Sequence, residues 1–285
     1  MRALRRPWAM KVQALIFTDL DGTLLDEEYR FDAASAALEV IRRRRIPLIL
    51  TSSKTLAEMR LLRRAMDLNH PFIFENGAGL ALPEGYFTAG ARTDSSTPLR
   101  VEHFGPTYAD IRRILDELRA LHGFAFRGFG DMSATEIASR TGLDEIAAQR
   151  ARQRHGSEPG IWQGSEAIRR DFIAEIEKAG LRAVSGGRFL HIMPRIDKAE
   201  AMRELVGRYT AAEPETRFRV IAAGDSPNDA DMLQMADLAV VIQRSDSSWM
   251  PLARREGVVR SPVPGPAGWQ ICLERLLEEE TGEPE

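Results

Sequence analysis

The chain is short of cysteine, of net charge and of long apolar runs, and each shortage excludes a class of protein. Its single cysteine, Cys272, excludes an internal disulfide and fits a reducing compartment. A net charge of −3 over 285 residues is not that of a dedicated nucleic-acid or membrane-surface binder. No apolar run reaches the length of a transmembrane helix. We therefore expect a cytoplasmic monomer or homodimer with no nucleic-acid or membrane partner.

Other common features are also missing. The Arg-rich opening, residues 1–11, lacks the apolar segment of a secretory signal. We interpret it as a frayed tail, with Met10 as an alternative to Met1 as the first residue. None of the five histidines pairs with another at metal-ligand spacing, so zinc is not expected. Lysine occurs at only four positions, because nearly all cations are arginine; these are Lys11, Lys54, Lys178 and Lys198.

The strongest signal is the stretch of residues 14–23, ALIFTDLDGT. Its apolar part is typical of a buried parallel strand, and it stops at two carboxylates and a glycine. Because strand side chains alternate between faces, Asp19 and Asp21 should point the same way at the strand's carboxyl end. Two anions so close require a cation or a shared proton. The alternative is a β-turn with solvated acids, since Asp-Gly is a common turn signal.

Residues 17–25, FTDLDGTLL, resemble the first signature of the haloacid dehalogenase superfamily of phosphohydrolases. In that family the first aspartate attacks phosphorus, and the second acts as general acid and base. The backbone carbonyl of the second aspartate also binds magnesium. The resemblance therefore implies that Asp19 is the nucleophile and that Asp21 is the acid/base.

Two further segments match the family's second and third signatures in order. Ser52 stands where the family places a hydroxyl that holds the phosphate with the amide that follows it, and Ser53 and Lys54 come next. Oriented neutral donors of this kind suit a transferring phosphoryl group. Lys198 matches the third signature, where a lysine holds nucleophile and phosphate together. The alternatives are an ordinary helix N-cap for Ser52 and a surface position for Lys198.

Residues 224–229, GDSPND, match the fourth signature. Asp225 should end a strand beside the first one and complete an oxygen shell with Asp19 and the Asp21 carbonyl. Hard oxygen ligands suit Mg²⁺, and the spacing of a calcium-binding EF-hand is absent. Asn228 and Asp229 are expected to orient ligands and water from just outside that shell.

The elements around these motifs predict an α/β fold, a doubly wound parallel sheet of the haloacid dehalogenase type. Strands are predicted at 15–17, 47–50, 72–74, 218–222 and 238–242. Helices are predicted at 32–45 with Asp32 as N-cap, after Thr55, at 197–209, and after a Pro/Gly-rich loop at 261–268. Polar residues end each strand, as in doubly wound sheets. We expect a catalytic core of residues 1–82 and 195–285.

Residues 83–194 depart from this pattern and are predicted to form an inserted α+β cap that selects the substrate. Its predicted helices span 106–121, begin at Ser133 with a capping box to Glu136, and span 165–178 with Ile168, Phe172 and Ile176 on one face. Two glycines predict a tight hairpin at 184–189.

Short motifs over nearly the whole chain after residue 12 resemble the mannosyl-3-phosphoglycerate phosphatases within the superfamily. The resemblance implies a Mg²⁺-dependent phosphomonoesterase acting on a phosphorylated sugar through an aspartyl-phosphate. A phosphoglycerate glycoside carries a carboxylate next to its phosphate and a sugar beyond it. The polar residues best suited to bind these two groups are Lys54, Asn76, Glu158 and Arg188. For His191, buried packing is the preferred interpretation. Three alternatives stay open: another sugar-phosphate phosphatase, a phosphomutase of the phosphomannomutase type, and a catalytically idle sensor.

Overall fold

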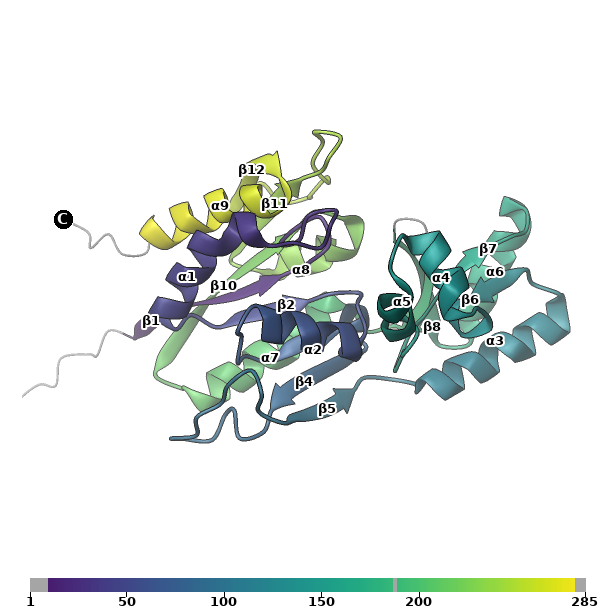
Figure 1. Cartoon of the computed structure of the whole chain (residues 1–285), viewed down its shortest axis with the longest axis horizontal. Helices are drawn as coiled ribbons and strands as arrows, with labels where there is room; N and C mark the ends of the chain where they lie inside the picture. The colour runs from purple at the N-terminus through teal and green to yellow at the C-terminus, as the bar shows by residue number, and fades with distance from the viewer. Residues whose placement is uncertain (1–9, 187–188, 280–285) are drawn as a thin grey trace, which may run out of the picture.

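The protein consists of two bodies that lie at opposite ends of its long axis (Figure 1). We describe a computed structural model over residues 10–186 and 189–279. An eight-stranded sheet forms the larger body and a four-stranded sheet forms the smaller one. Within these residues, no helix is both long and apolar enough to cross a membrane.

The larger sheet has the strand order β12-β11-β10-β1-β2-β3-β4-β5. The strands from β12 to β3 are parallel, and β4 and β5 are added antiparallel at one edge. The bounds are β1 Lys11–Thr18, β2 Leu48–Thr51, β3 Phe72–Phe74, β4 Gly79–Pro83, β5 Leu99–His103, β10 Thr216–Gly224, β11 Leu238–Gln243 and β12 Val258–Pro264. The carboxyl ends of the parallel strands therefore meet at one edge, where the predicted motifs lie.

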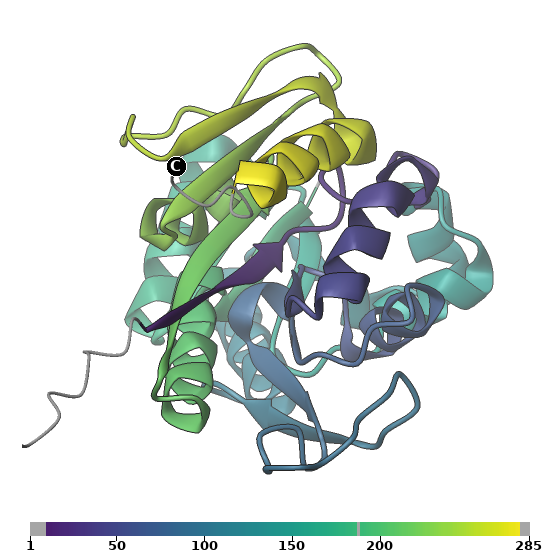
Figure 2. The same ribbon diagram turned by 90° about the vertical axis from the view of Figure 1, so that its left-hand side faces the viewer.

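Helices cover both faces of this sheet, which confirms the doubly wound α/β class (Figure 2). Ile16 packs on one face with α1, α2 and α9, whereas its neighbours Leu15 and Phe17 pack on the other with α7 and α8. The bounds are α1 Ser35–Arg44, α2 Leu56–Ala65, α7 Lys198–Ala212, α8 Ala230–Met235 and α9 Gly265–Glu279. Three short 3₁₀ turns lie in the connections of this body: Asp32–Ala34, Glu75–Gly77 and Pro227–Asp229.

The smaller body is an antiparallel sheet, β6-β7-β9-β8, with helices on both faces. One face packs against α3 and α6 through Ile111 and Phe172, and residues of α4 and α5 form a separate cluster with Phe129. The bounds are α3 Tyr108–His122, β6 Phe126–Gly128, a 3₁₀ turn Phe129–Asp131, α4 Ala134–Thr141, α5 Glu145–Ala151, β7 Glu158–Trp162, α6 Glu166–Lys178, β8 Leu181–Gly186 and β9 Phe189–Pro194.

The start of the inserted segment differs from the sequence-based boundary at Pro83. Strand β5 still pairs with β4 in the larger sheet, from Gly79↔His103 to Pro83↔Leu99. The four-stranded sheet and its helices therefore come after β5, and we propose that the cap begins after His103. A hairpin that extends a sheet edge shows the same alternation as a cap strand, so the pattern alone did not separate the two.

Three local predictions were wrong. Asp32 is not the N-cap of α1; it begins a 3₁₀ turn, and α1 starts at Ser35. Residues 261–264 are not a loop but the end of β12, which is an edge strand and so tolerates proline. Ile168 is half-exposed and does not join Phe172 in the core.

The expected capping box of α4 is half formed. The hydroxyl of Ser133 accepts a hydrogen bond from the Glu136 amide, as predicted. The carboxylate of Glu136 does not return to the N-cap, because it binds the guanidinium of Arg127 from β6. An ion pair between the helix and the sheet has thus replaced one of the two local hydrogen bonds.

Candidate active site

Two acidic loops, one after β1 with Asp19 and one after β10 with Asp225, lie side by side because β1 and β10 are adjacent and parallel, with Thr18 opposite Ala223. The Asp19 amide donates to the Ala223 carbonyl at 2.9 Å, which fixes the start of the first loop. Thr18 is buried beneath it; its hydroxyl donates to the Asp19 carbonyl at 2.8 Å and accepts from the indole of Trp269 at 3.0 Å. Trp269 on α9 therefore supports Thr18 at the start of the loop that carries Asp19, a contact that its position in the sequence does not reveal.

The turn after Asp19 requires glycine. Gly22 has a φ of +78°, and a Cβ there would lie 2.9 Å from Oδ2 of Asp225. The neighbouring Thr23 hydroxyl donates to Oδ1 of the same carboxylate at 3.2 Å. The first loop is thus shaped to hold the Asp225 carboxylate beside it.

Lys198 joins the centre from the start of α7. Its side chain is 1% exposed, and Nζ lies 2.5 Å from Oδ1 of Asp19 and 2.7 Å from Oδ1 of Asp229. Burial alone would lower the lysine pKa, but these two carboxylates raise it. The surface alternative for Lys198 is therefore wrong, and the ammonium stays charged between two anions.

Three carboxylates gather around this lysine, because Asp19, Asp225 and Asp229 each place one oxygen within 4.8 Å of the others. Burial, and next the charge of Asp229, raises the pKa of Asp19; the same two causes raise that of Asp225 to about 6. Both shifts mean that negative charge is unfavourable here without a further cation. A divalent cation would supply that charge.

Asp229 stabilises the loop that follows β10. Its Oδ2 accepts hydrogen bonds from the amides of Asp225 and Ser226 and from the Ser226 hydroxyl, at 3.0–3.2 Å. With Oδ1 on Lys198, few lone pairs of Asp229 are left to bind an ion. The orienting role of Asp229 stays a prediction. Asp19 and Asp225 accept fewer hydrogen bonds through their carboxylates and so keep more lone pairs for an ion.

Asp21 lies at the edge of the same centre and is more exposed, at 46% of its side chain. Its Oδ1 forms an ion pair with Nζ of Lys54 at 2.8 Å, and this lysine also lies 4.4 Å from the ring centre of Tyr29. Burial would lower the pKa of Lys54, but the charges of Asp21 and Glu58 outweigh it and raise that pKa. An accessible carboxyl beside the buried carboxyl of Asp19 is the arrangement that the predicted acid/base role of Asp21 requires.

The second signature is a loop after β2. Ser52 is buried, and its hydroxyl accepts from the Lys54 amide at 3.2 Å, which leaves its own hydrogen free to donate. Thr55, and not Ser52, is the N-cap of α2, with a complete capping box to Glu58. The helix N-cap alternative for Ser52 is therefore wrong. Its carbonyl accepts from the Asn76 amide at 2.8 Å, so this loop and the next are tied together.

These loops open into a cleft of about 430 Å³ between the two bodies. It is lined on the larger body by Asp19, Asp21, Tyr29, Ser53, Lys54, Glu58, Asn76, Asp225, Ser226, Pro227 and Asn228, and on the smaller body by Phe129, Thr141, Ala151, Arg154, Pro159, Val184, Ser185, Phe189 and His191. Asn228 donates to Oδ1 of Asn76 at 3.2 Å, and both residues lie on the larger body. His191 thus lines the cleft, and Arg188 lies outside the described residues.

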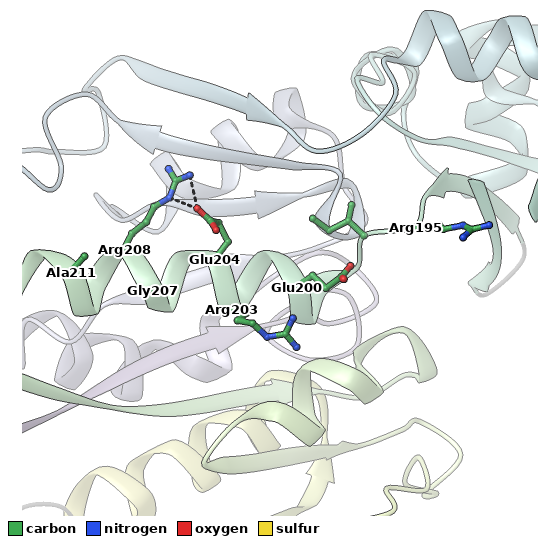
Figure 3. Close-up of a pocket in the computed structure, with 8 residues that line it drawn as sticks. Arg195, Glu200, Arg203, Glu204, Gly207, Arg208 and Ala211 are labelled. Atoms are coloured by element: carbon green, nitrogen blue, oxygen red, sulfur yellow. Dashed lines mark hydrogen bonds and ion pairs between the residues drawn. The ribbon is translucent and has the colours of Figure 1, made fainter. Parts of the chain in front are cut away.

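A larger hollow of about 600 Å³ lies along α7, where Glu204 and Arg208 form an ion pair (Figure 3). It is lined mainly by residues of α7, with Arg195 and Ile196 just before that helix, and contains none of the motif residues. Size alone would choose this hollow. The convergence of the acidic loops identifies the smaller cleft as the candidate site.

Glu158 does not lie in the cleft, although the sequence analysis predicted that it binds the substrate. The residue is fully buried, does not line the cleft, and accepts from Nη1 of Arg112 at 3.0 Å and from the Gly130 amide at 2.8 Å. Burial raises its pKa. These contacts hold β7 against α3, so the structure gives Glu158 a role inside the smaller body.

A contact that sequence reasoning missed joins the two bodies at the cleft. Glu75, at the end of β3, is fully buried and accepts from the amides of His155 and Gly156 and from the Ser157 hydroxyl at 2.7–3.0 Å. Arg154 lies 3.6 Å from the same carboxylate. Burial would raise the pKa of Glu75, but Arg154 and these donors together lower it to about 2.

This contact gives a prediction for stability. Because the folded-state pKa of Glu75 lies below its ordinary value of 4.5, the ionised carboxylate stabilises the folded protein above pH 4.5. The shift corresponds to about 3 kcal/mol, and the contribution is lost as the pH falls toward 2. Glu75→Gln should therefore lower the unfolding free energy by about 2–3 kcal/mol at pH 7, measured by urea titration.

The difference between Glu75→Gln and the wild type should shrink steadily between pH 4.5 and pH 2. Glu84→Gln removes an exposed carboxylate a few residues away and should change little. A constant difference at every pH would mean that the carboxylate charge of Glu75 does not stabilise the fold.

The sheet and its acidic loops define a class of protein, the haloacid dehalogenase-like hydrolases. A sequence profile of that family matches residues 16–89 and 163–255. The chain belongs to this family.

Two curated relatives align over nearly their whole length. The glucosyl-3-phosphoglycerate/mannosyl-3-phosphoglycerate phosphatase of Methanococcoides burtonii is 36% identical, covering 92% of this chain and 97% of that one. The protein of the same name from Persephonella marina is 33% identical, covering 93% and 97%.

Solved structures agree with the fold. A Thermoplasma acidophilum protein has a TM-score of 0.63 at 18% identity, covering 93% of this chain and 99% of its own. The sucrose-phosphatase of Synechocystis has a TM-score of 0.59 at 17% identity, covering 94% and 98%. These two likenesses concern the fold alone.

Proposed function

We propose that this chain is a Mg²⁺-dependent phosphomonoesterase that hydrolyses mannosyl-3-phosphoglycerate, or its glucosyl analogue, to the glycosylglycerate and phosphate. The observation that carries the proposal is the buried Asp19, held at 2.5 Å by Lys198 with Asp225 beside it, at the bottom of a cleft. The names of the two curated relatives support the substrate.

In the proposed first step, a carboxylate oxygen of Asp19 attacks phosphorus and the ester bond to the glyceryl oxygen breaks. Lys198 binds Oδ1 of Asp19, which fixes the carboxylate and directs its other oxygen to the phosphate. Asp21 gives its proton to the leaving oxygen. The products of this step are an aspartyl-phosphate at Asp19 and the free glycosylglycerate.

In the second step, water attacks the same phosphorus. Asp21, now ionised, takes the proton of that water, phosphate leaves, and the Asp19 carboxylate is restored. The ion pair of Asp21 with Lys54 at 2.8 Å holds this carboxyl at the edge of the centre, where it can reach both the leaving oxygen and the attacking water. The Ser52 hydroxyl and the Ser53 amide serve as donors to the phosphate in both steps.

The donors for the metal are oxygens only: the carboxylates of Asp19 and Asp225 and the carbonyl of Asp21. The raised pKa of each carboxylate fits a site that is completed by a cation. When bound, Mg²⁺ would offset the charge of phosphate and nucleophile. Asn228, which donates to Asn76, and Asp229, which holds the loop, would orient these ligands.

Phosphate release from a panel of esters tests the proposal. We expect kcat/KM for mannosyl- or glucosyl-3-phosphoglycerate to exceed that for mannose 6-phosphate and glucose 1-phosphate by a large factor, because a buried polar group left without its partner costs about 1–3 kcal/mol. A preference for a plain hexose phosphate would contradict the glycosyl-3-phosphoglycerate substrate and leave only the assignment as a phosphatase. Transfer of phosphate between sugar carbons with little free phosphate would instead favour a phosphomutase.

The remaining assignments follow from the same site. The proposed partner is a small phosphorylated sugar, taken up between the two bodies. We also propose a cytoplasmic location, since the one cysteine, Cys272, is free and buried.

A further inference from the structure

Arg154 is a cation of the smaller body that lines the cleft and is held rigidly there. It is 9% exposed and comes from the segment between α5 and β7. Its Nη2 donates to the Ser157 hydroxyl at 2.6 Å and to the Ser53 carbonyl at 3.1 Å, and its Nε donates to the Ser157 carbonyl at 3.4 Å. These bonds fix the plane of the guanidinium.

The remaining nitrogen, Nη1, has no hydrogen-bond partner within residues 10–186 and 189–279. Arginine offers five donors in a planar fork, which suits a carboxylate or a phosphate. Since the side chain lines the cleft, the unused edge of the fork is available to a ligand there.

The positive charge of Arg154 is also less neutralised than that of the two lysines of the site. Lys54 and Lys198 lie within 2.8 Å of carboxylates. Arg154 lies 3.6 Å from Glu75, whose oxygens already accept three closer hydrogen bonds from neutral donors. A second anion can therefore bind Arg154 without displacing Glu75.

His191 on β9 adds a polar group to the same part of the cleft. Its Nδ1 is buried without a hydrogen-bond partner in the described structure. Burial, and next the charge of Arg154, lowers the pKa of His191 to about 3. The imidazole is therefore neutral and offers one N–H donor.

We propose that Arg154, with His191 beside it, binds the carboxylate of the glycerate part of the substrate. The inference rests on the proposed function, because only a phosphoglycerate substrate carries that carboxylate next to the phosphate. Arg154 binds the carbonyl of Ser53 in the phosphate loop, so a ligand whose phosphate lies on that loop places its neighbouring anion close to the guanidinium. A cation in this place distinguishes phosphoglycerates from phosphate esters that have no carboxylate.

A pair of small substrates isolates the carboxylate. 3-Phosphoglycerate and glycerol 3-phosphate share a phosphorylated three-carbon chain, and only the first has a carboxylate. In Arg154→Gln we expect the ratio of their kcat/KM values to fall about 10- to 100-fold, the usual effect of losing a charge-assisted hydrogen bond. The change should appear mainly in KM for 3-phosphoglycerate, while glycerol 3-phosphate is hydrolysed nearly as before.

Two further variants control the experiment. Arg152→Gln removes an exposed arginine of the same segment that does not line the cleft, and it should leave the ratio unchanged. Arg154→Lys keeps the charge but loses the fork, so it should recover part of the ratio. It also provides the test if Arg154→Gln does not fold, because its ratio should still lie below that of the wild type.

An equal loss with both substrates would overturn the proposal and leave Arg154 only a structural link to Ser53 and Glu75. A wild type without preference for 3-phosphoglycerate over glycerol 3-phosphate would also overturn it. A wild type that prefers hexose phosphates over glycosyl-3-phosphoglycerates, measured separately, would instead contradict the proposed function.

Discussion

Asp19→Asn is expected to lower kcat/KM for mannosyl-3-phosphoglycerate by about 10⁴–10⁶-fold, the range seen when a central catalytic group is removed. The amide keeps the shape of the carboxylate but is a poor nucleophile, so no aspartyl-phosphate can form. Initial rates of phosphate release measure the loss. Mass spectrometry of acid-quenched enzyme should detect an added phosphoryl group in the wild type only.

The fold should survive this change. Asp19 is one of three carboxylates that crowd around Lys198, and its raised pKa means that its charge is unfavourable in the metal-free protein. We therefore expect the Tm of metal-free Asp19→Asn to stay at or above that of the wild type. Asp171→Asn, at an exposed position on α6, is the matched control and should change neither activity nor Tm. Wild-type turnover by Asp19→Asn would place the nucleophile elsewhere.

Asp21→Asn separates the second carboxylate from the first. Loss of a general acid and base should cost about 10²–10⁴-fold in rate with a sugar-linked substrate. p-Nitrophenyl phosphate has a leaving group that needs no proton, so this variant should still form the aspartyl-phosphate from it. An equal block with both esters would mean that Asp21 does more than move protons.

The motifs could be found from the sequence because their loops each directly follow a strand or open a helix. In a parallel sheet the carboxyl ends of neighbouring strands meet, so the acids that follow β1 and β10 lie together because these two strands are neighbours. Local sequence was sufficient to single out Asp19, whereas Asp225 also needed the resemblance, because the sequence alone does not show that its strand lies beside the first. Lys198 needed the resemblance as well, since a lysine at the start of a helix carries no local signal.

The contacts between the two bodies could not be found in this way. Glu75 and His155 are 80 residues apart in the chain, and no periodic pattern relates them. Glu75 looked like one more polar residue after a strand, and Arg154 like one of many arginines. Their burial follows from how the smaller body sits on the larger one, which short sequence patterns do not encode.

Glu158 illustrates the opposite error. Its position within a resemblance motif suggested a group that contacts the ligand, but its partner is Arg112 on α3, 46 residues earlier in the chain. An acidic residue in a strand can reach either the cleft or the interior, depending on which face of the sheet it occupies. The sequence near Glu158 did not reveal that Arg112 would pair with it inside the smaller body.

Removal of divalent ions should abolish turnover, and Mg²⁺ should restore it. The carboxylates of Asp19 and Asp225 lie together in a buried site with raised pKa values, and a phosphate would bring further negative charge to it. Without a cation the attack of one anion on another is strongly opposed. Activity after treatment with EDTA and gel filtration, followed by titration with MgCl₂, measures the effect.

Binding of the ion can also be followed without activity. Mg²⁺ at about 100 times its Kd should stabilise the folded wild type by about 2.7 kcal/mol, which is seen as a rise in Tm. Asp225→Asn replaces an anionic ligand by a neutral one, so its Tm should respond only at much higher Mg²⁺ concentrations, whereas Asp171→Asn should respond like the wild type. Full turnover by metal-free enzyme would contradict the metal assignment, and an unchanged Mg²⁺ response in Asp225→Asn would remove Asp225 from the ligands.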